Sequence, residues 1–317
     1  MALAPVAVPR YGWRTDRLGR DMMFKGPFLQ ALTAFAGLLV AAPAAAETQG
    51  FQSDRITVTT EGSGPDVILI PGMTSSPSAW RSVSGMPGYR FHYVQVKGFA
   101  GTVPEANASG NVSAPVAEEI ARYIEAAELE RPALVGHSMG GTMALMIAAR
   151  HPGAVSKVMV VDQLPFMGIV YGPPGTTPES VRPTADKQRA SMIEATPEEF
   201  QKRLVAMTTA MVRDKEQRTL VLADAEASDR ETVANAFHEL IVTDLRPELP
   251  SIKVPATVLY VTPQGVPLTD AQMDAVYQAS YAPLEGVKLV RVPDSAHFIM
   301  SDNPERFQAE LKAFLAE

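Results

Sequence analysis

The feature that most constrains the fold of this chain is a serine framed by glycines, between a short apolar segment and a helix-forming one. Residues 136–140 read Gly-His-Ser-Met-Gly. The apolar run 132–135 begins at a proline, as expected of a buried strand, and residues 142–150 favour an apolar helix that ends at His-Pro-Gly. A sharp strand-to-helix turn lifts the serine hydroxyl out of the sheet, and the flanking glycines leave the space that such a turn needs. The pattern therefore predicts a strand, a nucleophilic Ser138 and a helix in succession.

Strands and helices alternate along most of the remaining chain. Short apolar or alternating runs predict further strands, and runs with apolar residues about every 3.6 positions predict helices between them. Such alternation is typical of an α/β protein with a mostly parallel central sheet and helices on both faces. The strands are expected at 55–60, 67–70, 91–96, 155–161, 257–261 and 287–292, and the helices at 75–83, 115–129, 270–281 and 304–316.

One long segment, residues 168–247, interrupts the alternation. It opens near Pro173-Pro174-Gly175 and contains amphipathic helical stretches with few strand signals. Helices inserted after one strand of a parallel sheet are typical of a lid over its carboxyl edge, where ligands bind in this architecture. The predicted organisation is therefore a first part of the core over residues 47–167, a helical lid over 168–247 and a second part of the core over 248–317.

The N-terminal residues 1–46 have the pattern of a targeting segment. Lys25 precedes an uncharged run, residues 26–42, which leads into Ala44-Ala45-Ala46. A positive start, an apolar stretch and a small-residue exit predict a secretory signal peptide that is cleaved after Ala46. A membrane anchor is the alternative, although the run is only marginally long enough to span a bilayer. We expect a periplasmic or secreted protein without stable membrane insertion. The start of translation is left open between Met1, Met22 and Met23.

Charge and cysteine content exclude several classes of function. The chain has 317 residues, a formal net charge of −7 and no cysteine. The negative charge offers no basic surface for nucleic acid, so we expect no nucleic-acid partner. The absence of cysteine excludes a thiol nucleophile, disulfides and a thiolate-bound metal. No cofactor and no metal are expected.

A serine hydroxyl becomes a good nucleophile only when a base removes its proton, so a histidine must reach Ser138. His297 lies in a loop between the last predicted strand and the last helix, at the strand's carboxyl end, where a base should be placed. His137 is the neighbour of Ser138 in the chain, and its side chain is expected to point away. The other histidines are His92, in a strand pattern, His151, at a helix end, and His238, in the lid. His297 is therefore the predicted base.

From Arg55 to its C-terminus the chain resembles the α/β-hydrolase superfamily, in particular its lid-bearing serine esterases and aminopeptidases. The resemblance depends on Leu-Ile-Pro-Gly-Met at 69–73, on the serine motif, on the strand that ends at Asp162 and on the Ala-His-Phe loop at 296–298. It implies an α/β-hydrolase fold. It also implies an oxyanion hole formed by the backbone N–H groups of Met73 and Met139, which would stabilise charge on a reacting carbonyl oxygen.

The acid that should orient His297 departs from the family's pattern. The family usually places it in the loop after the strand that here ends at Val261, where this chain has Val266. Asp162, at the end of the neighbouring strand, is the favoured replacement, since one strand spacing is within reach of the same histidine. Asp270 or Asp274, or no carboxylate at all, are the alternatives.

The substrate pocket and the reaction are predicted least sharply. Phe166 and Met167 are the favoured pocket residues. Less favoured candidates are the lid methionines Met192, Met207 and Met211. The predicted function is hydrolysis of a small, largely apolar carboxylic ester through an acyl-enzyme.

Two alternatives to an esterase remain open from the sequence. The first is an amidase or aminopeptidase, in which Glu198, Glu199 or Glu226 of the lid would bind a substrate ammonium. The second is a non-catalytic binding protein on the same scaffold, a possibility raised by the valine at the usual acid position. If the protein is an esterase or an amidase, we expect its substrate to be a small-molecule ester or amide.

Overall fold

A computed structural model describes residues 46–47 and 50–317 of the chain. The predicted signal peptide, and the membrane anchor that is its alternative, lie outside the described residues apart from Ala46. Within the described part, no helix combines the length and the apolar character that a membrane span requires.

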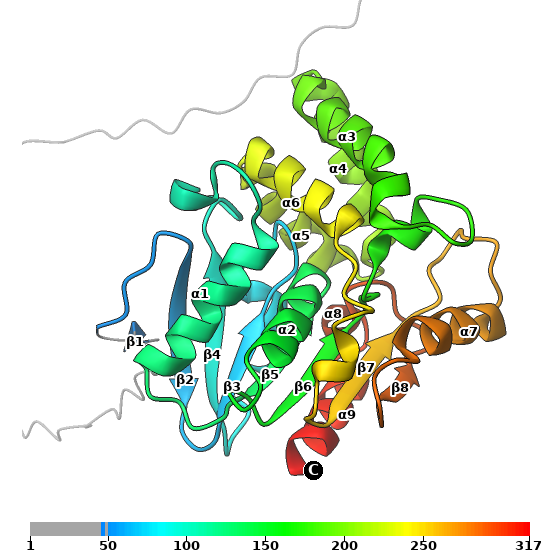
Figure 1. Ribbon diagram of the computed structural model, residues 1–317. Helices are drawn as coiled ribbons and strands as arrows, with labels where there is room; N and C mark the ends of the chain where they lie inside the picture. Colours follow the sequence, from blue (N-terminus) through cyan, green and yellow to red (C-terminus); the bar gives the residue numbers. More distant parts are fainter. Residues whose placement is uncertain (1–45, 48–49) are drawn as a thin grey trace, which may run out of the picture. The chain divides into compact units, whose positions relative to one another are not determined.

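A central sheet forms the core of the described part (Figure 1). In spatial order its strands are β1 (Ala46–Glu47), β2 (Ile56–Gly62), β4 (Arg90–Val96), β3 (Asp66–Ile70), β5 (Ala133–His137), β6 (Lys157–Val161), β7 (Ala256–Tyr260) and β8 (Lys288–Arg291). The strands from β4 to β8 in this order are parallel, and only β1–β2 and β2–β4 pair antiparallel. The predicted α/β fold with a mostly parallel sheet is therefore confirmed.

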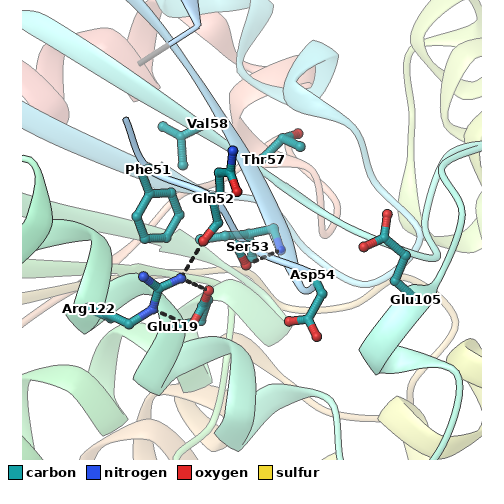
Figure 2. A pocket seen from close by; sticks show the side chains of 10 residues that line it. Phe51, Gln52, Ser53, Asp54, Thr57, Val58, Glu105, Glu119 and Arg122 are labelled. Carbon is teal, nitrogen blue, oxygen red and sulfur yellow. Dashed lines mark hydrogen bonds and ion pairs between the residues drawn. The ribbon is translucent and has the colours of Figure 1, made fainter. Parts of the chain in front are cut away.

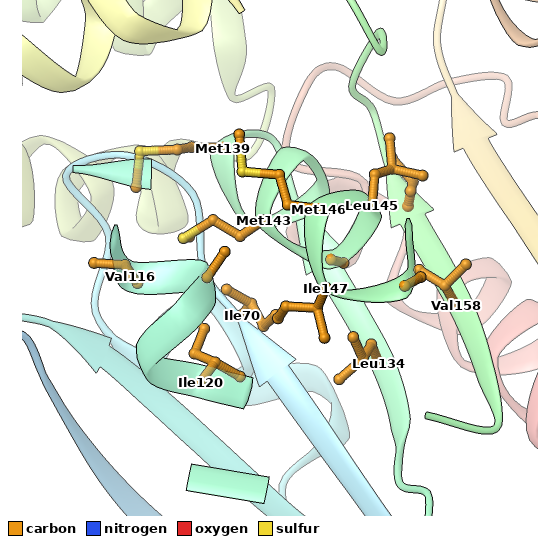
Figure 3. Close-up of a cluster of buried hydrophobic side chains, with 14 of the residues drawn as sticks. Ile70, Val116, Ile120, Leu134, Met139, Met143, Leu145, Met146, Ile147 and Val158 are labelled. Atoms are coloured by element: carbon orange, nitrogen blue, oxygen red, sulfur yellow. The ribbon is translucent and has the colours of Figure 1, made fainter. Parts of the chain in front are cut away.

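Side chains of the central strands alternate between two cores, one on each face of the sheet. In β3, Ile68 and Ile70 pack into one core, whereas Val67 and Leu69 pack into the other. A strand covered on both faces is apolar at successive positions for this reason. The first core, shown in Figure 3, is closed by α1 (Ser113–Ala126), α2 (Met139–Arg150) and α7 (Asp270–Tyr281). The second is closed by the 3-10 helix η1 (Pro77–Val83), α8 (Ile299–Asp302) and α9 (Pro304–Ala316).

Four α-helices lie between β6 and β7 in the chain, and they lie above the sheet in Figure 1. They are α3 (Pro178–Glu194), α4 (Pro197–Met211), α5 (Lys215–Ala227) and α6 (Arg230–Val242). All of them fall inside residues 168–247, which we call the helical insertion. Each begins after a Thr or Asp whose side chain accepts a hydrogen bond from the backbone of the first turn. These caps satisfy backbone N–H groups that the helix itself cannot pair, and thereby fix where each helix starts.

Candidate active site

Ser138 lies in the turn between β5 and α2, in a backbone conformation that is unusual for a residue with a side chain. Its φ is 53° and its ψ is −122°. Its N–H donates to the carbonyl of Val161 at 2.9 Å, and its carbonyl accepts from Gly141 and Thr142 at 2.7 and 3.2 Å. These bonds hold a conformation that costs free energy on its own. Ser138 is therefore presented by a rigid, strained turn, as the serine motif predicts.

The two glycines of the motif are required by close backbone approach. A Cβ at Gly136 would overlap the carbonyl of Gly140. A Cβ at Gly140 would overlap the carbonyl of Ile70, at the end of β3. The sequence folds into this turn because only glycine fits at these two positions.

His297 and Asp162 are joined by a direct hydrogen bond. Nδ1 of His297 lies 2.7 Å from Oδ2 of Asp162, and the two side chains are 20% and 10% exposed. Because a carboxylate can only accept, Nδ1 carries the proton and Nε2 is left with a free lone pair. This is the tautomer that a general base needs.

Two further groups fix the orientation of the Asp162 carboxylate. Its Oδ1 accepts hydrogen bonds from the backbone N–H of Val261 and from the hydroxyl of Tyr277, both at 3.1 Å. Burial, with a smaller contribution from Asp162, raises the pKa of Tyr277 well above its usual value, so the hydroxyl remains a donor. Asp162 itself has a left-handed backbone, with φ 52°. The second oxygen is thereby directed at His297.

The alternative acids interact elsewhere. Asp270 accepts from Thr262 at 2.7 Å and pairs with Arg291 at 2.6 Å. Asp274 binds the hydroxyl of Tyr260 and Nε of Arg291, each at 2.9 Å. Neither is hydrogen-bonded to His297, whereas Asp162 is.

The backbone N–H groups of Met73 and Met139 are free to bind a ligand oxygen. Met139 is the first residue of α2, where helix N–H groups have no acceptor within the helix. Met73 precedes Thr74, which has a positive φ of 63°. In the described part of the chain neither N–H has a hydrogen-bond acceptor. This placement is compatible with an oxyanion hole.

A small cavity of about 40 Å³ lies beside Ser138 and His297. Its core-side walls include Ser138, His297 and the Gly72–Met73 turn. The helical insertion supplies four further walls, and three core residues complete the lining: Met207, Thr208, Met211 and Val221 of the insertion, and Thr74, His137 and Phe298 of the core. No carboxylate, lysine or arginine lines the cavity. The cavity is therefore a mostly apolar recess that Ser138 and His297 both line.

The favoured pocket residues of the sequence are not among these walls. Phe166 is 1% exposed and packs against α3 and α6 in a separate cluster, with Arg246 over its ring at 4.7 Å. Met167 packs against the first core. Two of the less favoured methionines, Met207 and Met211, take their place. The docking of the insertion's helices decides which residues line the cavity, and a residue's place in the sequence does not reveal that docking.

The glutamates proposed to bind a substrate ammonium also lie outside the cavity. Glu199 caps α4 through Thr196, and Glu198 pairs with Lys202 on the surface. Glu226 accepts from Gln201. Among the described residues, none of those that line the cavity is therefore anionic.

A much larger hollow, of about 750 Å³, lies at the edge of the sheet near β2 and α1 (Figure 2). Arg122 crosses its wall, paired with Glu119 and donating to the carbonyl of Gln52 at 2.6 Å. It contains neither histidine nor a strained serine, so its chemistry does not compete with the cavity at Ser138.

One carboxylate links the His297 loop to the helical insertion, and sequence reasoning missed it. Asp302 accepts from the N–H groups of Arg213 and Asp214, between α4 and α5, at 2.8 and 3.0 Å. Its other oxygen accepts from the N–H of Ala296 at 2.8 Å. The N–H of Phe298 adds a bond of 3.2 Å to the carbonyl of Met211. The loop of His297 is therefore fastened to the insertion on both sides of this residue.

Comparison with known families agrees with the fold. The family model described as "Alpha/beta hydrolase family" matches residues 67–310. The chain is similar to a pimeloyl-[acyl-carrier protein] methyl ester esterase of Pectobacterium carotovorum, with 25% identity, covering 80% of this chain and 96% of that protein. It is also similar to an enzyme of the same name from Vibrio vulnificus, with 28% identity and coverage of 67% and 82%.

Solved structures repeat the architecture at low identity. A hydrolase from Pseudomonas aeruginosa superposes with a TM-score of 0.67 at 18% identity, covering 83% of this chain and 94% of that one. The enol-lactonase from Burkholderia xenovorans superposes with a TM-score of 0.66 at 19% identity, covering 83% and 96%. At these identities the similarity establishes the fold.

Proposed function

Since this chain belongs to the alpha/beta hydrolase family, we propose that it is a serine hydrolase that cleaves a carboxylic ester through an acyl-enzyme. Two observations carry the proposal: the 2.7 Å bond between His297 and Asp162, and the cavity that His297 and Ser138 both line. A nucleophile, a base and a group that orients the base form the minimal machinery for acyl transfer.

In the acylation step, Ser138 Oγ attacks the ester carbonyl while Nε2 of His297 takes the hydroxyl proton. The carbonyl oxygen becomes negative and is stabilised by the N–H groups of Met73 and Met139. The imidazolium then gives its proton to the departing alcohol as the bond between the carbonyl carbon and the alcohol oxygen breaks. Asp162 stabilises the positive charge that His297 carries between these events.

In the deacylation step, water replaces the alcohol. His297 takes a proton from water as its oxygen attacks the acyl carbonyl, and returns that proton to Ser138 Oγ as the acid leaves. The serine and the neutral histidine are regenerated, so no cofactor is consumed.

The cavity favours an ester whose part beside Ser138 is small and uncharged. Its volume of about 40 Å³ is small beside the roughly 300–1,000 Å³ of pockets that bind drug-sized ligands. The absence of a carboxylate among its walls gives no support to an aminopeptidase. The names of the relatives, which are methyl ester esterases, agree with ester cleavage.

Substrate size is tested with p-nitrophenyl esters of graded acyl length. We expect kcat/KM to fall by at least about 10-fold from acetate to octanoate, because a filled apolar pocket discriminates by about this much per misplaced methylene. Met211→Ala should enlarge the recess and reduce that ratio. An unchanged ratio in the variant would exclude Met211 as a wall of the acyl pocket.

Labelling with a fluorophosphonate tests the proposed nucleophile. The probe reacts with an activated serine, and we expect one label at Ser138 that is lost in Ser138→Ala. An intact, folded protein that does not react would instead favour a non-catalytic scaffold.

The helical insertion is proposed to act as a lid, because it supplies four walls of the cavity. We also propose that residues 1–46 are a signal peptide and that the mature protein is periplasmic or secreted. N-terminal sequencing of exported protein should find Glu47 first; a retained apolar segment would indicate a membrane anchor.

A further inference from the structure

We propose that His137, the residue before Ser138, is a positioning residue that holds the loop of His297 by donating a hydrogen bond from its ring. The inference rests on the proposed function, in which His297 is the base. His137 is one of the residues that line the cavity, and in this account it acts on the reaction through the loop of His297.

The contact runs from ring to backbone. Nε2 of His137 lies 3.0 Å from the carbonyl oxygen of His297. A carbonyl oxygen only accepts, so Nε2 carries the proton and donates. The rings of His297 and Phe298 both lie 4.6 Å from that of His137, centre to centre. Two consecutive residues, His297 and Phe298, therefore contact His137 through one hydrogen bond and two ring contacts.

The opposite side of the ring faces the turn that carries Met73. A Cβ at Gly72 would lie only 2.9 Å from Nδ1 of His137 and 3.1 Å from Cβ of Ser138. The imidazole thus lies between the turn of the proposed oxyanion hole and the loop of the proposed base. Because Ser138 follows His137 in the chain, His137 contacts or adjoins all three parts of the proposed site: the serine, the Gly72–Met73 turn and the loop of His297.

Stability alone does not account for a histidine at this position. His137 is fully buried, and within the described residues its Nδ1 has no hydrogen-bond partner. A buried polar atom without a partner is unfavourable, so Nδ1 adds nothing to the stability of the fold. The contrast is His92, also buried, whose two nitrogens bind Tyr123 and Asp66 at 2.7 and 2.8 Å. Both ring nitrogens of His92 are hydrogen-bonded, whereas only one ring nitrogen of His137 is.

The ring must also be neutral to serve this purpose. Burial, and then the proximity of His297, lower the pKa of His137 well below its usual value. A neutral donor can hold the carbonyl without opposing the positive charge that His297 acquires when it takes the serine proton.

The test compares two side-chain amides that differ by one methylene. Gln in His137→Gln can place its NH₂ near the position of Nε2, whereas Asn in His137→Asn is too short to reach the carbonyl. We expect the Asn variant to lose about 10- to 100-fold in kcat on p-nitrophenyl acetate with KM little changed, since small misplacement of a base costs this much. The Gln variant should recover most of the activity. His137→Phe, which keeps a ring but has no donor, should behave like Asn.

His92→Gln and His92→Phe are the matched controls, because they alter a buried histidine away from the cavity. They should lower thermal stability and leave kcat within about two-fold. Equal losses in His137→Gln and His137→Asn would overturn the proposal, as would full activity in a folded His137→Phe.

A second measurement does not depend on catalysis. Hydrogen exchange of the backbone N–H groups of residues 296–298 should be faster in His137→Asn than in the wild type, and unchanged in the His92 variants. If the wild type hydrolysed no ester, this exchange would still decide whether His137 holds the loop. Unchanged exchange in His137→Asn would contradict the proposal.

Discussion

Backbone strain is concentrated at the residues that form the candidate site. Of the eight non-glycine residues with positive φ in the described part, four lie in the turns that build it. They are Thr74, after the Gly72–Met73 turn, Ser138, Asp162 and Asp294, before the base loop. Each such residue costs free energy of about 1–3 kcal/mol, which the surrounding packing must offset. The strained backbone thus lies in the turns that orient the side chains of the candidate site.

At the level of single residues, Asp162→Asn is the sharpest change available. Asn can still accept from Val261 and Tyr277 through its oxygen, but its NH₂ would then face Nδ1 of His297. That arrangement imposes the wrong tautomer on the histidine, so we expect kcat to fall by at least about 10²-fold. Thermal stability should change little, and steady-state kinetics beside a melting curve measures both.

Asp270→Asn and Asp274→Asn are the controls for this change, because both carboxylates bind Arg291 and not His297. We expect each to keep nearly full activity. If Asp274→Asn lost its activity while Asp162→Asn stayed active, the acid would lie after β7, where the family usually has it.

At the level of elements, the helical insertion is fastened to the core by two carboxylates, of which Glu239 is buried. Glu239 of α6 is 2% exposed and accepts from the N–H groups of Val112, Ser113 and Ala114, at 2.7, 2.6 and 2.9 Å. These are the unpaired donors at the start of α1, so one side chain of the insertion completes a helix of the core. Together with Asp302, it makes the insertion part of the framework that positions His297.

Glu239→Ala should therefore destabilise the protein strongly. Three backbone N–H groups would lose their acceptor, which should lower the free energy of unfolding by about 3 kcal/mol. The matched control is Glu231→Ala on the same helix. The Glu231 side chain is 60% exposed and forms a long, exposed ion pair of 3.6 Å with Arg189. That change should cost less than about 0.5 kcal/mol. Urea unfolding of both variants measures the difference, and equal costs would show that the cap contributes nothing.

The elements themselves were predicted from the sequence with unequal success. The helices at 270–281 and 304–316 coincide with α7 and α9, since each begins at a recognisable cap or proline and has clear apolar periodicity. The segment at 75–83 was predicted as an ordinary helix and is a 3-10 helix over Pro77–Val83. The antiparallel pairing of β2 was not predicted, because direction in a sheet depends on long-range contacts that a single strand's pattern does not contain.

In the candidate site, too, some residues could be predicted from the sequence and others depend on long-range packing. Ser138, His297 and Asp162 were chosen from a motif and from their places at strand ends, and the structure brings all three to one region. Their catalytic roles remain a proposal. The cavity walls Met207 and Met211, and the links made by Asp302 and Tyr277, depend on how helices dock. Amphipathic periodicity shows which face of a helix is apolar, and not which partner that face meets.

At the level of the whole molecule, buried histidines should make stability depend on pH. Burial lowers the pKa of His137 and of His92 below the ordinary value of 6.5. Below pH 6.5 the unfolded chain therefore binds protons that the folded protein does not, and the free energy of unfolding falls as pH decreases. The slope is about 1.4 kcal/mol per pH unit for each histidine until its folded pKa is reached.

Thermal melts between pH 8 and pH 5 measure this effect. His92→Gln should reduce the slope below pH 6.5, because it removes one of the two groups. A melting temperature that rises on acidification from pH 7 to pH 5 would contradict the assignment of these two residues as neutral.

The central claim, that Ser138 is acylated with the help of His297 and Asp162, is tested most directly by trapping the intermediate. Protein mixed rapidly with p-nitrophenyl acetate and quenched in acid is analysed by intact mass and peptide mapping. We expect a fraction of the protein to carry one acetyl group, on the peptide that contains Ser138, and Ser138→Ala to carry none and to have lost turnover. Ester hydrolysis at the wild-type rate in folded Ser138→Ala, with no acetyl group on this peptide in the wild type, would contradict the account.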